Sequence, residues 1–157
     1  MENKMTDSNA ETEREAIKSW YTKALHAMTR EMIKIKAVAG PAVEARPVWI
    51  SPYKILIARV WEASQKSNFI WTISGEGVIT DHIAGNMAAT PREVVRHFSL
   101  KWQMDADQLL VLAKNKASVK ESQQHMEAYT TKLIQYAESL YDLANLDDVW
   151  QQKPPGK

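Results

Sequence analysis

The sequence predicts an α+β protein with a long N-terminal helix, a small antiparallel β-sheet of two to four strands, and two C-terminal helices. Apolar side chains recur at helical spacing over residues 12–38 and again over residues 90–146. Between these segments, residues 48–74 are rich in β-branched and aromatic residues, which favour strands. A two-stranded ribbon is only marginally stable alone, so we expect the sheet to pack against the helices.

The first helix is expected from about Thr12 to Val38. Its apolar stripe contains Ile17, Trp20, Tyr21, Ala24, Leu25, Met28, Met32 and Ile35. Thr12 and Glu15 have the spacing of a capping box, in which side chains satisfy the backbone N–H groups of the first turn. Gly40 and Pro41 are expected to end the helix.

The strand-rich region contains a short candidate strand, VWIS at 48–51, which ends at Pro52. A stronger strand follows at 54–63. Residues 64–68 have turn composition, so FIWTIS at 69–74 is expected to return as the second strand of a hairpin.

The glycine-rich segment 75–89 has weak periodicity and allows two interpretations. It forms either a long loop or a further short strand around Val78 and Ile79, followed by a turn. The SGEG sequence at 74–77 lacks the lysine and the following helix of a phosphate-binding loop, so a turn after the strand explains its glycines. Long loops are uncommon without a functional reason, which makes the segment a candidate functional region.

A second helix is expected to start at Thr90, with Pro91 in the first helical position and Glu93 three residues after the cap. It runs to about Asn115. SVKE at 118–121 resembles another capping box and starts a last helix, although the two segments could also form one longer helix with a kink. One face of the last helix is apolar: Met126, Tyr129, Leu133, Tyr136, Ala137, Leu140 and Ala144.

Length and composition set the class of protein. The chain has 157 residues without internal repeats or an interior linker, so residues 12–148 are expected to form a single domain. Residues 1–11 are expected to be a disordered leader and residues 149–157 a flexible tail. The absence of cysteine excludes disulfides, thiolate metal sites and cysteine nucleophiles.

Charge and hydropathy bear on location and partners. Lys and Arg number 20 and Asp and Glu 19, a balance that argues against a general nucleic-acid binder. The N-terminus is polar and lacks the apolar core of a secretory signal, and no apolar run approaches the ~20 residues of a membrane helix. We therefore expect a cytoplasmic protein that does not contact a membrane.

The stretch TPREVVRHFSLKWQ at 90–103 divides into three faces when residues are placed about 100° apart. The buried arc continues past this stretch and contains Val94, Val95, Phe98, Trp102, Ala106, Leu109 and Ala113. One flank contains Arg92, Arg96, Ser99 and Gln103, and the other contains Glu93, His97 and Lys101.

Arg92 and Arg96 lie in the opening turns of this helix, where unsatisfied N–H groups and the helix dipole favour anions. The two guanidinium groups could bind a carboxylate or phosphate. The structural interpretation, which we favour, is that they pair with Glu76 or Asp81 of the preceding segment.

The histidines are weaker candidates. Glu93 lies one turn before His97 and is expected to stabilise its imidazolium. Asp81 and His82 could meet His97 in an acid–base or metal site, but neighbouring Asp and His side chains point in different directions and no metal-ligand spacing is present. The sequence therefore predicts no metal, no cofactor and no assigned catalytic residue.

The chain contains six tryptophans. Four lie in predicted elements and are expected in the core: Trp20, Trp61, Trp71 and Trp102. Trp49, beside prolines, and Trp150, near the C-terminus, are better placed for a groove or a partner surface.

FIWTISGE at 69–76, TDHI at 80–83 and TPREVVRHFSLKWQ at 90–103 resemble a bacterial domain of unknown function found mostly in gammaproteobacteria. Its members look like small proteins with a W-x-I-S-G-[DE] strand end, a T-D-[HY] loop and a T-P-R…R-H-F…W-Q helix. The resemblance covers residues 45–110. Many members have a proline where this chain has Gly77–Val78–Ile79, so the loop geometry differs. The matching positions are Trp71, Ser74, Gly75, Asp81, Thr90, Pro91, Arg92, Arg96, His97, Phe98, Trp102 and Gln103. The resemblance implies no known activity.

The leading hypothesis is a non-catalytic domain that binds an unidentified protein partner through residues 75–89 and the Arg92/Arg96 helix start. Dimerisation through a helix face or the sheet edge is compatible with this hypothesis. The alternative is a binder or enzyme for a small anionic ligand, with Arg92 and Arg96 holding the anion and Asp81, His82 or His97 acting as acid–base groups. Nucleic-acid binding is a third hypothesis.

Overall fold

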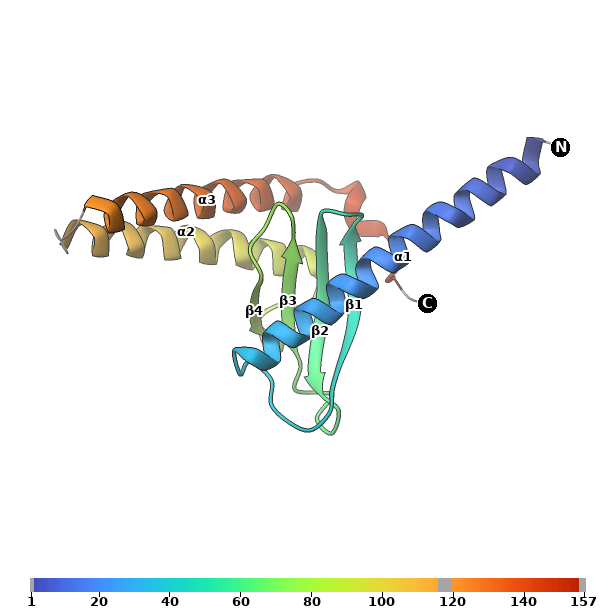
Figure 1. Ribbon diagram of the computed structural model, residues 1–157, viewed down its shortest axis with the longest axis horizontal. Helices are drawn as coiled ribbons and strands as arrows, with labels where there is room; N and C mark the ends of the chain where they lie inside the picture. The colour runs from blue at the N-terminus through green and yellow to red at the C-terminus, as the bar shows by residue number, and fades with distance from the viewer. Residues whose placement is uncertain (1, 116–119, 156–157) are drawn as a thin grey trace. The chain divides into compact units, whose positions relative to one another are not determined.

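A computed structural model describes residues 2–115 and 120–155 of the chain. The elements follow the predicted α+β order (Figure 1): α1 (Glu2–Lys34), β1 (Val43–Ser51), β2 (Ile55–Glu62), β3 (Ile70–Gly75), β4 (Asp81–Ala84), η1 (Gly85–Met87), α2 (Pro91–Asn115), α3 (Lys120–Ala144) and η2 (Asp148–Gln151). The predicted domain contains two compact units. We call them the sheet unit, which extends to Gly85 and includes the chain from Gln152, and the helical unit, Asn86–Gln151. Within the described residues, no helix combines the length and the apolarity needed to cross a membrane.

Helix α1 begins at Glu2, within the segment 1–11 that was expected to be a disordered leader. This segment contains good helix formers and neither glycine nor proline, which lets the helix extend towards the N-terminus. Thr12 is consequently inside the helix: its hydroxyl donates to the Ser8 carbonyl at 2.9 Å and cannot act as an N-cap.

The C-terminal end of α1 also differs from the prediction. Lys36 adopts a positive φ of 61°, and Ala37 N donates to Met32 O at 2.9 Å while Lys36 N donates to Ile33 O at 3.1 Å. This is the hydrogen-bond pattern of a Schellman motif, which satisfies the last carbonyls of a helix. The helix therefore ends before Gly40 and Pro41.

The four strands form one antiparallel sheet in the order β1-β2-β3-β4. The predicted hairpin of β2 and β3 is confirmed. β1 is longer than expected, because a register shift between Pro47 and Trp49 accommodates a proline that cannot donate a backbone hydrogen bond. The predicted strand around Val78 and Ile79 is displaced to β4, where pairing with β3 supplies the stability that its mixed sequence lacks.

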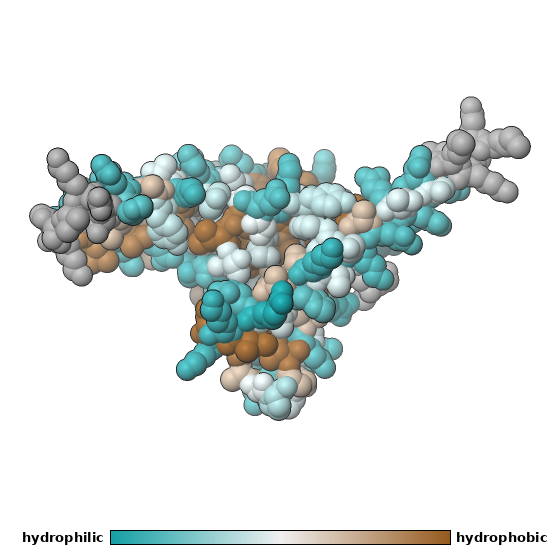
Figure 2. Space-filling view, viewed as in Figure 1, coloured by the Kyte–Doolittle hydropathy of each residue, from teal (hydrophilic) through white to brown (hydrophobic). Residues whose placement is uncertain are grey.

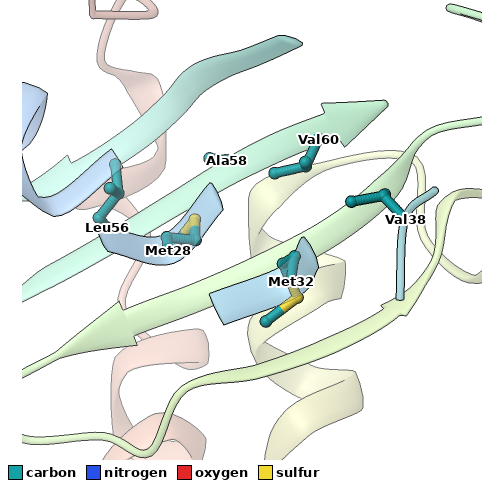
Figure 3. Packing of buried hydrophobic residues seen from close by; sticks show 6 residues of the cluster. All are labelled: Met28, Met32, Val38, Leu56, Ala58 and Val60. Carbon is teal, nitrogen blue, oxygen red and sulfur yellow. The ribbon is translucent and has the colours of Figure 1, made fainter. Parts of the chain in front are cut away.

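The core of the sheet unit lies between α1 and one face of the sheet (Figure 1). Its central cluster, shown in Figure 3, contains Met28, Met32, Val38, Leu56, Ala58 and Val60. Thr72 of β3 is buried beside it, and its hydroxyl oxygen lies 2.6 Å from Met28 Sδ and 3.2 Å from Ala58 O. This polar group is thus placed within hydrogen-bonding distance of acceptors inside an apolar layer.

In the helical unit, α2 and α3 lie side by side and run in opposite directions (Figure 1). Thr90 Oγ1 accepts a hydrogen bond from Glu93 N at 3.2 Å, which confirms Thr90 as the N-cap of α2. The chain forms two helices rather than one kinked helix, although Ser118 and Val119 of the predicted second capping box lie outside the described residues. The predicted buried arc of α2 is confirmed for Val94, Val95, Phe98, Trp102 and Ala106, while Leu109 and Ala113 are half-buried.

The C-terminal segment contains regular structure and contacts β1. Residues Asp148–Gln151 form a short 3-10 helix, and the side-chain amide of Gln152 bonds to the backbone of Ile50 in β1. Of the two tryptophans expected at a partner surface, Trp49 is 3% exposed and Trp150 is half-buried. The expectation for Trp49 is therefore wrong, because the bulged strand directs its indole into the protein.

Candidate functional site

The six predicted site residues divide between the two units. The sheet unit carries two of them on β4, Asp81 and His82. The helical unit carries four on α2: Arg92, Arg96, His97 and Gln103. Each group is therefore positioned by a separate set of packing contacts.

Asp81 and His82 are half-buried at the start of β4. The Asp81 carboxylate accepts a hydrogen bond from the backbone N–H of His82 at 2.8 Å, and His82 is the strand partner of Thr72. The carboxylate thus satisfies a local backbone donor, which is a structural role. Among the residues that the structure describes, no group of three or more His, Asp or Glu side chains is placed to hold a metal ion.

Arg92 has the structural role that we favoured, but with different partners. Its Nε donates to the Ala144 carbonyl at 2.7 Å, and Nη2 lies 2.9 Å from Asp147 Oδ1. The last carbonyls of a helix lack intrahelical partners and carry partial negative charge, so a guanidinium is stabilised at the end of α3. The predicted partners, Glu76 and Asp81, are replaced in this role by Asp147 and the helix end.

Arg96 lies one turn further along α2 and is exposed. It forms no ion pair with any residue of the two described ranges. Arg96 and Gln103 come together around a hollow of about 290 Å³, which is also lined by Ser99, Leu100, Tyr141, Ala144 and Asn145. One half of the predicted arginine flank therefore remains available to a partner.

The wall of this hollow is held in place by Ser99. Its buried hydroxyl donates to the Ala137 carbonyl of α3 at 2.7 Å, and Gln103 Nε2 donates to Ser99 Oγ at 3.4 Å. The hydrogen bond joins the two helices beside the hollow that Arg96 also lines. It therefore fixes how α2 presents this flank.

His97 lies on the other flank of α2 and is half-buried. Glu93 was expected to stabilise it, but the Glu93 carboxylate accepts from Ala89 N at 2.8 Å, in front of the helix. Lys101 on the same flank lies 3.3 Å from Asp105. His97 is not among the residues that line the hollow, so the histidine and Arg96 do not form one site within the helical unit.

Sequence reasoning missed a row of exposed apolar side chains on α2. Leu100, Met104 and Val111 are 58%, 53% and 57% exposed. Their separations of four and seven residues place them on one face, over about 16 Å of helix axis. Tyr141 of α3, which is also exposed, borders the same hollow as Leu100. Figure 2 shows apolar side chains at the surface over α2.

The signal for this row was present in the sequence. The three residues recur with helical spacing, but off the buried arc that contains Phe98 and Trp102. The row extends beyond residue 103, past the flanks assigned within the stretch 90–103. A second apolar hollow of about 440 Å³ lies near its far end and is lined by Asp107, Gln108, Val111 and Leu112.

Comparison with known proteins identifies the family. No match was found among curated proteins, and no solved structure matches the chain. A family model matches residues 15–150, a range that includes both the sheet and the α2–α3 hairpin. This chain therefore belongs to the family described as Domain of unknown function (DUF4826).

Proposed function

We propose that this protein is a non-catalytic, cytosolic interaction domain whose helical unit binds another protein. The binding region, which we call the α2 surface, contains Arg96, Leu100, Gln103, Met104, Val111 and Tyr141. The observation that carries the proposal is the exposed apolar row on α2, beside an exposed tyrosine and an arginine that has no ion-pair partner among the described residues. Burial of a large apolar side chain contributes about 1.5–3 kcal/mol, so covering this row would supply much of a binding energy.

The composition of the α2 surface fits a protein partner. Arginine and tyrosine are enriched among residues that dominate binding energies, especially beside apolar contacts that exclude water. The spacing of the apolar row matches an amphipathic helix of about 11 residues laid along α2. We expect the partner helix to carry a carboxylate opposite Arg96, because that guanidinium has no acidic partner in the described part of the chain.

A small anion is the second candidate ligand. Arg96, Gln103 and Asn145 offer hydrogen-bond donors around the hollow of about 290 Å³, which is close to the lower end of the volumes typical of ligand pockets. Against it, Arg92 is engaged by α3, so a clamp of two arginines is not formed. Titration with inorganic phosphate and with succinate would detect such a site as saturable binding that Arg96→Gln abolishes.

Site-specific photo-crosslinking in the native host tests the proposed function. Benzoylphenylalanine placed at Leu100 is expected to form one predominant adduct with another protein, and Arg96→Glu is expected to reduce that adduct several-fold. The same group at Glu138, an exposed position of α3 that does not line the hollow, is the matched control. Equal adducts from both positions, or adducts only with a second copy of this chain, would contradict the proposal.

A further inference from the structure

We propose a second binding site, in the sheet unit, that accepts an extended acidic segment of a partner protein as an additional strand on β1. The site, which we call the α1–β1 groove, has a volume of about 640 Å³. Its lining includes Lys23, Leu25, His26 and Arg30 of α1, and Val43 and Ala45 of β1. All of these residues belong to the sheet unit, so the site does not depend on the α2 surface.

The first half of β1 has an unpaired backbone edge. β1 is the outermost strand of the sheet and pairs only with β2. Ala63 N donates to Ala42 O at 2.9 Å, so the backbone of Ala42 faces β2. Because N–H and C=O groups of an antiparallel strand alternate between its two sides, Val43 and Ala45 direct theirs away from β2. These are the two β1 residues that line the groove.

The second half of the same edge is closed. Pro47 has no N–H to offer, and it lies at the register shift of β1. Beyond it, Gln152 Nε2 donates to Ile50 O at 3.0 Å, and Gln152 Oε1 accepts from Ile50 N at 3.2 Å. One side-chain amide therefore reproduces the two hydrogen bonds of a neighbouring strand. Native proteins protect exposed edges in this manner, which makes the unprotected Val43–Ala45 half distinctive.

The groove is basic. Lys23, His26 and Arg30 are separated by three and four residues and lie on one face of α1. All three are exposed, and none forms an ion pair within the described part of the chain. Among the residues that the structure describes, no carboxylate lines the groove. Two permanent positive charges and a histidine that form no ion pair within the described residues favour a negatively charged occupant.

The basic side chains of α1 and the unpaired edge of β1 lie on the same side of the sheet. The side chains of Val43 and Ala45 pack on the α1 side of the sheet, so alternate side chains of an added strand would also point towards α1. Lys23 and Arg30 are about 10 Å apart along the helix axis, so the positive charge extends over two turns of α1. A segment with acidic residues at alternate positions would direct all of them towards the basic face of α1 while its backbone pairs with the edge. Leu25, Val43 and Ala45 give such a segment apolar contact.

NMR titration of the full chain tests this inference with a synthetic peptide of alternating Glu and Thr, ten residues long. We expect saturable shifts of the backbone amides of Val43, Ala45 and residues 22–30, and no saturable shifts with the matched peptide of alternating Lys and Thr. An acidic peptide N-methylated at every second residue is expected to bind at least tenfold more weakly, because it cannot pair with the strand edge. Equal affinity for the methylated peptide would overturn strand addition.

Charge-reversal variants distinguish binding in the groove from a general attraction between the peptide and the positive charges of α1. Lys23→Glu with Arg30→Glu is expected to weaken peptide binding at least tenfold, which corresponds to about 1.4 kcal/mol. Arg14→Glu with Lys18→Glu makes the same charge change at exposed positions of α1 outside the groove and is expected to leave binding within twofold. Equal losses in both double variants would overturn the site.

Two other occupants of the groove, a second copy of this chain and a nucleic acid, can be distinguished from the acidic segment by similar titrations. Shifts of Val43 and Ala45 that grow with protein concentration alone would assign the edge to a second copy of this chain. A ten-nucleotide single-stranded DNA that binds the groove more tightly than the acidic peptide would assign it to nucleic acid. Either result would overturn the proposal, whatever the outcome at the α2 surface.

Discussion

The sheet unit and the helical unit stabilise the ends of their helices and strands by different means. In the sheet unit, reversals depend on backbone conformation: Lys36 and Tyr53 have positive φ values, and so do Gly40 and Gly75. In the helical unit, side chains satisfy the helix ends, through Thr90 and Glu93 at the start of α2 and Arg92 at the end of α3. A substitution in the first unit therefore meets steric strain, whereas one in the second removes a hydrogen bond.

Of the substitutions that test this difference, Gly75→Ala should reduce the free energy of unfolding most. Gly75 has a φ of 155°, and an added Cβ would overlap the backbone carbonyl oxygen of Lys54. Backbone atoms cannot move aside as a flexible side chain can, so we expect a loss of roughly 3 kcal/mol in the free energy of unfolding. Chemical denaturation followed by tryptophan fluorescence measures it.

Gly77→Ala is the matched control in the same turn, because an added Cβ there meets no atom within 4 Å. We expect its unfolding free energy to stay within about 0.5 kcal/mol of the unsubstituted chain. Equal losses for both glycines would show that the turn responds to any added side chain, and that backbone geometry at Gly75 is not the cause.

Arg92→Ala tests the side-chain mechanism of the helical unit. It removes the hydrogen bond to the Ala144 carbonyl as well as the ion pair with Asp147, and we expect a loss of about 1–2 kcal/mol. Asp147→Ala removes only the ion pair. The Asp147 side chain is 81% exposed, so this change should cost no more than about 0.5 kcal/mol. Thermal unfolding of both variants gives the comparison, and equal losses would assign the effect to the ion pair.

Ser99→Ala should have the smallest effect of the three. The buried hydroxyl donates to Ala137 O across the hairpin, and its loss should cost about 1 kcal/mol. Ser139 also donates to a carbonyl, but within its own helix and at the surface. Ser139→Ala is expected to be neutral, since alanine has the higher helix propensity. A neutral Ser99→Ala in denaturant titrations would show that apolar packing alone positions α2 and α3.

The two units also differ in what they offer to partners. The helical unit exposes apolar side chains beside a single arginine, whereas the sheet unit exposes backbone groups beside several cations. Apolar rows suit a partner helix, and an unpaired strand edge suits an extended segment. The proposed surfaces therefore select for different secondary structure in what they bind, and variants of one should leave the other unchanged.

The order of elements and the buried face of α2 could be predicted because they depend on local patterns. Val94, Phe98 and Trp102 recur at the helical period, and Thr90 satisfies an N–H only three residues away. β4 could not be placed correctly in the same way. Its four residues have no strong strand pattern, and pairing with β3 decides where the strand lies.

The candidate site was only partly accessible from the sequence for the same reason. Arg92 and Arg96 could be assigned to one flank of α2 by counting residues. Only Arg92 has a hydrogen-bond partner at the end of α3, because the fold brings Ala144 to Arg92 across 52 residues of chain. The basic stripe of α1 could also be counted in the sequence, but the strand edge beside it could not.

The sequence by itself determined the α+β class, the helix N-cap at Thr90, the hairpin of β2 and β3 and the buried arc of α2, because each follows from spacing along a short stretch of chain. Only the tertiary structure decided that Gln152 closes one half of the β1 edge and that α3 engages Arg92 but not Arg96. These contacts join residues distant in sequence, and whether a polar group is satisfied depends on which partner the fold brings within hydrogen-bonding distance.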